Sequence, residues 1–148
     1  LNLSQDANQI HKSLDGLKWI TYLNPNDPVF EINQLKKALV LISNNSKNKM
    51  LITQYQFIAP ALKIFDNSPN QWHHATVSFP VKGQKYFDEY KNYFVDKIIK
   101  RKIDGIYVVG KEDENTPQLV LDRDCLNKEI IDEIIFYYSI NKKCKDFK

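Results

Sequence analysis

The feature that most constrains the fold of this chain is an alternation between short apolar runs and longer stretches with helical periodicity. Continuous apolar runs at Met50–Thr53 and Gly105–Val109 are each bounded by polar residues. Such runs are typical of parallel strands buried on both faces. The alternation predicts an α/β fold: a single three-layer domain with a small, mostly parallel sheet of about four or five strands flanked by helices. We expect it to be Rossmann-like without a glycine-rich phosphate loop.

The longest periodic stretches predict two amphipathic helices. Asp27 and Pro28 form a helix start with a cap and a first-turn proline, and apolar residues then recur at helical spacing up to Ile42. A second long helix is predicted from Phe87 to Ile98. Shorter helices are expected from Ser4 to Gly16, around Pro60, and from Ile130 to Tyr138 at the end of the chain.

Three further strands are predicted, at residues 17–22, 63–65 and, as an edge strand, 118–121. Periodicity fails between residues 66 and 83, which predicts a long loop, and residues 111–117 form a charged loop. Ligands favour the carboxyl ends of strands in parallel sheets. This rule directs attention to the residues that follow the predicted strands: 24–27, 54–56, 66–68 and 110–111.

The length of 148 residues and the hydrophobic content of 43% predict one domain over residues 1–148. The first residue is Leu1 and the only methionine is Met50, so we expect a piece of a longer polypeptide. No stretch approaches the roughly 20 apolar residues that span a bilayer. Any membrane or targeting segment is therefore expected in the rest of that polypeptide.

The net charge of +3 comes almost entirely from lysine, because Arg101 and Arg123 are the only arginines. Nucleic-acid readers rely on arginine forks and clustered basic faces, whereas these lysines are spread along amphipathic helices. We expect no nucleic-acid partner.

Cofactor motifs are not present in the sequence. It has no GxGxxG or GxxxxGK[ST] motif, and it holds only four glycines. His73 and His74 are adjacent, so in an extended chain they point in opposite directions and cannot easily hold one metal ion. We therefore expect neither a cofactor nor a metal.

The loop from Asp66 to His74 is the densest cluster of chemically capable side chains. Ser68 with a histidine and Asp66 could form a nucleophilic site, but no GxSxG elbow supports it, and we assign no catalytic residue. The amides, hydroxyl, indole and imidazoles also suit a surface that binds a sugar ring or a polar head group. The simpler alternative is a structured turn pinned by Trp72 in the core.

Two cysteines, Cys125 and Cys144, flank the last predicted helix and lie in no metal-ligand spacing. The residues alone leave two alternatives open. In a reducing compartment they are two free thiols, whereas in an oxidising one a bridge between them could stabilise the fold by roughly 3 kcal/mol.

Several runs together carry a family resemblance. The chain resembles the carboxy-terminal soluble region of bacterial multi-spanning membrane glycosyltransferases of the dolichyl-phosphate-mannose type, from about Leu17 to Cys144. The runs that carry it are Leu51–Ile58, Asp66–His73, Val77–Pro80 and Lys85–Tyr90.

The resemblance implies a periplasmic accessory domain that packs over the parent's own upstream transmembrane region and helps to shape the site for a lipid-linked sugar or an acceptor glycan. The family's catalytic carboxylate lies between early membrane helices, so this fragment itself is expected to be non-catalytic. The resemblance also implies a Cys125–Cys144 disulfide. The surface that it selects for testing comprises Gln54, Tyr55, Asp66, Asn67, Ser68, Trp72, His73 and His74.

Two other functions stay open at this stage. The chain could be a free-standing cytoplasmic α/β domain that binds a small metabolite at the strand ends or acts as an enzyme through the Asp66–His74 loop. It could instead be a protein-interaction module that uses its exposed aromatic residues.

Overall fold

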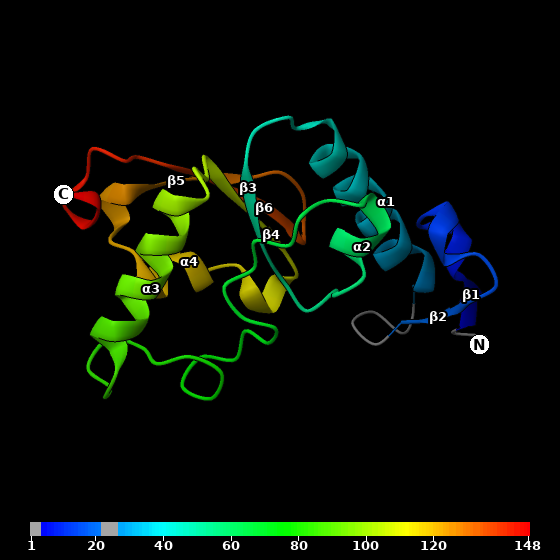
Figure 1. Cartoon of the computed structure of the whole chain (residues 1–148). Helices are drawn as coiled ribbons and strands as arrows, with labels where there is room; N and C mark the ends of the chain where they lie inside the picture. Colours follow the sequence, from blue (N-terminus) through cyan, green and yellow to red (C-terminus); the bar gives the residue numbers. More distant parts are fainter. Residues whose placement is uncertain (1–3, 22–26) are drawn as a thin grey trace. The chain divides into compact units, whose positions relative to one another are not determined.

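The structure is a computed structural model that describes residues 4–21 and 27–148 (Figure 1). The chain divides into two compact units. The first comprises residues up to Asn45 together with Phe57–Ile64, and the second comprises Ser46–Gln56 together with Phe65–Lys148. The prediction of one domain over the whole chain stays a prediction, because this division does not test whether either unit folds alone.

The first unit is mostly helical. Its main element is α1 (Pro28–Asn44), which begins as the sequence predicts: Asp27 Oδ1 accepts a hydrogen bond of 3.2 Å from Phe30 N, and Pro28 occupies the first turn. The apolar stripe of α1, from Ile32 to Ile42, is buried. The short helix around Pro60 is also confirmed, as α2 (Ile58–Leu62).

The helix predicted from Ser4 to Gly16 is wrong. Strand β1 (Ser4–Asp6) pairs antiparallel with β2 (Lys18–Ile20), and two 3-10 turns, η1 (Ala7–Gln9) and η2 (Lys12–Leu14), lie between them. The strand predicted at 17–22 is present as β2, but it belongs to this two-stranded sheet, and Tyr22 lies outside the described residues. Each short strand is stabilised by a partner distant in sequence, which local propensity does not reveal.

The second unit is built on a four-stranded mixed sheet with the order β3-β4-β6-β5. Strands β3 (Lys49–Thr53) and β4 (Gly105–Val109) confirm the two apolar runs and pair in parallel. Strands β5 (Leu126–Ile130) and β6 (Ile135–Ile140) form an antiparallel hairpin, and β6 also pairs antiparallel with β4. The fold is therefore α/β, but the expectation of a mostly parallel, Rossmann-like sheet is wrong because only one pair is parallel.

The main core of this unit lies on one face of the sheet. Register places Met50 beside Ile106 and Ile106 beside Tyr138, all fully buried on that face. Helix α3 (Phe87–Lys100), predicted from its periodicity, contributes Phe94 and Ile98 to the same cluster. The apolar stripe of α3 and the side chains that the strand register places on this face therefore pack into one core.

The closing helix is the largest error of the sequence prediction, because Ile130 ends β5, residues 131–134 form the connecting turn, and residues 135–138 belong to β6. The isoleucines from Ile130 to Ile135 also fit a helical spacing, which made the pattern ambiguous. The run Ile135–Ile140 is rich in β-branched and aromatic residues, and pairing with β4 on one side and β5 on the other favours a strand.

Two shorter predictions are also wrong. Residues 118–121 are not an edge strand: α4 (Thr116–Val120) begins with a proline in its first turn, a helix signal that the charged surroundings obscured. Residues 63–65 form no strand, and Lys63 instead ends α2 in the left-handed conformation.

None of the helices in the described ranges 4–21 and 27–148 is both long enough and apolar enough to cross a bilayer.

Candidate binding site at the carboxyl ends of β3 and β4

The parallel pair brings two polar segments together at one edge of the sheet. Thr53 and Val109 are register partners at the ends of β3 and β4, and Thr53 Oγ1 donates a buried hydrogen bond of 2.7 Å to Val109 O. The segments 54–56 and 110–111 therefore leave the sheet side by side. Of the other two predicted strand-end segments, 66–68 follows no strand and 24–26 lies outside the described residues.

Asp113 is buried immediately beyond β4. Gly110 adopts a φ of 128°, which turns the chain into η3 (Lys111–Asp113), and the Asp113 N–H donates to Gly110 O at 3.3 Å. Asp113 is 1% exposed, and its Oδ2 has no hydrogen-bond partner among the described residues. Burial, reinforced by the neighbouring charge of Glu112, raises the pKa of Asp113 to about 6.

Gln54 supplies a second buried group at this edge. Its amide lies close enough to the carboxyl group of Asp113 to oppose the rise in that pKa. Its Nε2 is nevertheless buried without a hydrogen-bond partner of normal geometry in the described part of the chain. The amide therefore has a donor left to offer.

His73 is the third buried polar group. Its side chain is 5% exposed, and neither ring nitrogen has a partner among the residues described. Burial lowers the pKa of His73 to about 4, although the charge of Asp66 acts in the opposite direction. The ring is therefore neutral at pH 7, with one nitrogen able to donate and the other able to accept.

His73 and Asp113 line the same pocket, which has a volume of about 500 Å³. Buried polar groups without partners are costly, and native proteins usually satisfy them with solvent or a ligand. The pocket can therefore bind a molecule with hydrogen-bonding groups. Other lining residues are His74, Lys111, Glu112, Asn115 and Thr116, with Val77 and Leu119 as apolar members.

The side chains of residues 66–68 form hydrogen bonds within the protein and do not line this pocket. Asn67 Nδ2 donates to Lys49 O at 3.0 Å, and Ser68 Oγ donates to Leu51 O at 2.7 Å, so both side chains serve carbonyl groups of β3. Asp66 Oδ1 accepts from Ser68 N at 2.8 Å. These side chains cover the free edge of the sheet.

The remaining predicted residues surround these two regions. Tyr55 is half-buried, and its backbone N–H donates to Thr53 Oγ1 at 3.0 Å. His74 is exposed and lines the pocket. Trp72 is 51% exposed, so the alternative in which Trp72 pins the turn in the core is wrong. His73 is buried instead, as is Pro69 in the same loop.

The nucleophilic cluster is not assembled. Ser68 Oγ donates to a backbone carbonyl, and no hydrogen bond within the described residues joins it to His73 or His74. A serine nucleophile needs a base within hydrogen-bond reach, and this geometry does not provide one.

Sequence reasoning missed Asp113 because it lay within a stretch interpreted as a charged loop. Its position four residues beyond a buried strand was the available signal, since that distance still lies at the carboxyl end of the sheet.

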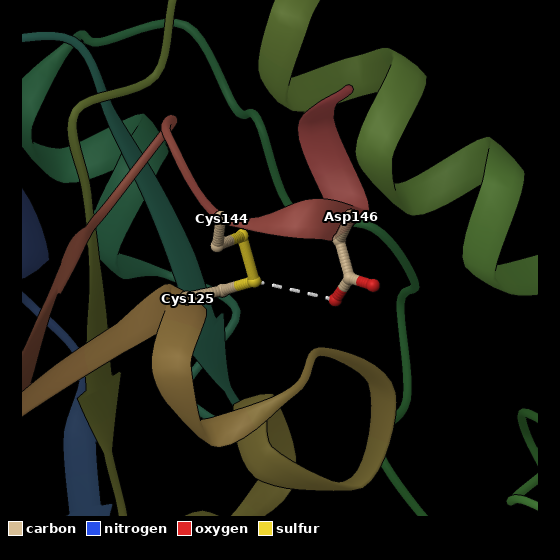
Figure 2. A group of neighbouring side chains, drawn as sticks. All are labelled: Cys125, Cys144 and Asp146. Atoms are coloured by element: carbon tan, nitrogen blue, oxygen red, sulfur yellow. Dashed lines mark hydrogen bonds between the residues drawn. A yellow bond between two sulfur atoms is a disulfide. The ribbon is translucent and has the colours of Figure 1, made fainter.

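Cys125 and Cys144 form a disulfide with a Cα–Cα distance of 5.2 Å. Figure 2 shows Asp146 beside it, with Oδ2 3.3 Å from Cys125 Sγ. These three residues are the one cluster of at least three His, Cys, Asp or Glu ligand atoms within the described ranges. Metal binding requires thiolates, and in this state the two sulfur atoms are bonded to each other.

Asp146 also connects the end of the chain to α3. Its Oδ1 lies 2.9 Å from Lys91 Nζ, and its Oδ2 accepts from Asp122 N at 3.0 Å. The disulfide and this ion pair hold the segment after β6 in place.

The fold and the pocket together define a mixed α/β chain with an unsatisfied polar site at its strand ends. A scan of protein-family models, a search of curated proteins and a search of solved structures each found no match to this chain.

Proposed function

We propose that this chain is the extracytoplasmic accessory domain of a membrane-embedded glycosyltransferase that uses a lipid-linked sugar, and that it binds a saccharide without catalysing its transfer. The observation that carries the proposal is that one pocket is lined by two buried side chains, His73 and Asp113, whose ring nitrogens and Oδ2 have no hydrogen-bond partner among the described residues. The parent's upstream transmembrane region would be its partner.

The hydrogen-bonding groups of the pocket favour a polyhydroxyl ligand. Asp113 Oδ2 needs a donor, and the neutral His73 ring needs one donor and one acceptor. A hydroxyl group both donates and accepts, so neighbouring hydroxyls of one sugar ring can satisfy both side chains. An anionic phosphate offers acceptors and would be repelled by Asp113 and Glu112.

The disulfide supports the proposed location. Disulfides persist in oxidising compartments and are rare in the cytosol, and Cys125–Cys144 closes a loop with a sequence separation of 19 residues. Mass measurement of the natural protein, alkylated before reduction, tests this point. The proposal expects both cysteines to be protected, whereas alkylation of both would favour the cytoplasmic alternative.

The cytoplasmic alternative is a domain that binds a small metabolite in the same pocket. Its volume of about 500 Å³ suits a small molecule of either kind. A neutral metabolite rich in hydroxyl groups would meet the same donors and acceptors, so the redox state of the cysteines is the better discriminator.

Calorimetric titration with a panel of mono- and oligosaccharides tests the binding function. His73→Phe and Asp113→Asn should each lower the affinity for the saccharide by roughly 10- to 100-fold, because each removes hydrogen bonds between the ligand and a buried side chain. Gln71→Ala, an exposed change in the same loop, is the matched control and should leave affinity unchanged. Equal binding by all four proteins would contradict the proposal, as would no binding of any saccharide.

A further inference from the structure

Two consecutive hydrogen-bonded turns form the end of the long loop before α3. In the first, Thr76 N donates to Phe79 O at 2.9 Å, and Ser78 N donates to His74 O at 2.7 Å. In the second, Gln84 N donates to Val81 O, and Gln84 Oε1 accepts from Val81 N, both at 3.0 Å. Both turns therefore have fixed backbones, although neither belongs to a helix or strand.

Each turn presents a large apolar side chain to solvent. Val77 is 83% exposed at the tip of the first turn, and Tyr86, which follows the second, is 61% exposed. Both side chains line one hollow of about 490 Å³. The hydrophobic effect opposes such exposure, so these positions suggest a surface that is covered in function.

The backbone conformation also indicates that this surface is functional. Thr76 and Tyr86 both have a φ of 68°, in the left-handed region that side chains with a Cβ disfavour. Such strain concentrates at functional sites, because packing and hydrogen bonds must hold it in place. Here the two strained positions are Tyr86 itself and the residue before Val77.

Charge indicates what covers the surface. Residues 75–86 contain Lys82 and Lys85 and no acidic residue, and Lys85 Nζ lies 4.8 Å from the centre of the Tyr86 ring. The hollow between the turns likewise has no acidic lining residue. Lys82, Lys85 and Tyr86 also line a neighbouring cavity of about 1020 Å³, which has mixed charge. Its other charged lining residues are Asp88, Glu89, Lys91, Asp122, Arg123, Lys145 and Asp146.

We infer that residues 75–86, the double turn, dock on an anionic lipid bilayer surface. Val77 and Tyr86 enter the head-group layer, where tyrosine is favoured, and Lys82 and Lys85 contact lipid phosphates. A lipid surface fits this composition because residues 75–86 combine exposed apolar side chains with two lysines and no acidic residue. Apolar side chains beside lysines are typical of segments that bind an anionic membrane surface.

Co-sedimentation of the chain with vesicles tests this inference. The chain should bind vesicles rich in phosphatidylglycerol and should bind pure phosphatidylcholine vesicles much more weakly. Each lysine near an anionic surface contributes about a factor of five, so Lys82→Gln with Lys85→Gln should lower binding by about 25-fold. Lys12→Gln with Lys36→Gln removes the same charge from exposed positions elsewhere and should leave binding within about twofold of the parent chain.

The apolar contribution is tested with Val77→Ser and Tyr86→Asn. Asparagine tolerates the left-handed conformation of position 86, so the fold should survive, and circular dichroism checks that it does. Each change should lower vesicle binding. Equal binding to both vesicle types, unchanged binding by the lysine variant, or no vesicle binding by the parent chain would overturn the inference. Saccharide binding should persist in Lys82→Gln/Lys85→Gln, so the two proposals can fail separately.

Discussion

The segment from Asp66 to Asn70 and the pocket of His73 and Asp113 have similar polar compositions but opposite hydrogen-bond states. In the segment, side-chain donors serve the edge of β3, and Asn70 Nδ2 donates to Tyr90 OH at 2.9 Å. Asn67 Oδ1 is the one buried side-chain atom of the segment without a hydrogen-bond partner among the described residues. In the pocket, both ring nitrogens of His73 and Oδ2 of Asp113 likewise have no partner within the described ranges. Polar composition therefore does not identify a binding site, whereas unused hydrogen-bonding capacity does.

The largest expected effect comes from the segment. Asn67→Ala with Ser68→Ala removes the donors to Lys49 O and Leu51 O. The free energy of unfolding should fall by about 2–3 kcal/mol, because part-buried carbonyls lose their partners. Chemical denaturation measures the change, with Gln71→Ala as the control. Saccharide affinity should be unchanged, because the segment stabilises the sheet and does not bind the ligand. A loss of affinity in the folded variant would contradict this assignment.

Substitutions in the pocket should instead raise the free energy of unfolding. Asp113→Asn removes a buried carboxylate whose ionisation opposes folding, and His73→Phe replaces an unsatisfied ring by an apolar one. Each should raise the free energy of unfolding at pH 8 by about 1–2 kcal/mol while weakening saccharide binding. Denaturation of the ligand-free variants measures this. If both variants were less stable than the parent chain, the two side chains would stabilise the fold. That result would contradict the difference proposed between the pocket and the segment from Asp66 to Asn70.

The smallest effect is in the pH dependence of stability. The pKa of His73 falls from 6.5 to about 4 in the folded chain, so the unfolded chain binds more protons in that window and acidification destabilises. The pKa of Asp113 rises from 3.8 to about 6, so acidification from pH 6 stabilises. The two contributions nearly cancel between pH 4 and 6.

The variants separate these contributions. Relative to the parent chain, His73→Phe should gain stability as the pH falls from 6 to 4, and Asp113→Asn should lose it, each by less than about 1.4 kcal/mol per pH unit. Denaturation midpoints across this range check the signs. Parallel curves for the three proteins would show that neither group is perturbed by the fold.

The elements that sequence predicted correctly are those with one unambiguous period. Helices α1 and α3 and strands β3 and β4 were recognisable because each has an apolar stripe or run bounded by polar residues. The hairpin of β5 and β6 was not recognisable, because its isoleucines fit two periods and its pairing with β4 is determined at a distance. Pairing between residues distant in sequence also determines that β1 and β2 form a two-stranded sheet.

The candidate site was predictable in part. His73, His74 and Gln54 were singled out by residue type and by the strand-end rule, and the structure places all three around the pocket or beside Asp113. The burial of His73 and the exposure of Trp72 could not be predicted, since the loop has no periodicity. Nor could the use of Asn67 and Ser68 as partners for β3, because it depends on which edge of the sheet stays free.

The central claim is that His73 and Asp113 hold a polyhydroxyl ligand, and nitrogen NMR of the His73 ring tests it most directly. The account predicts that the two ring nitrogens of the neutral imidazole change chemical shift as a bound saccharide is titrated, in the parent chain and equally in Gln71→Ala. The response should be much weaker in Asp113→Asn. Ring-nitrogen shifts that stay constant while a saccharide saturates the protein would place the ligand elsewhere and contradict the account.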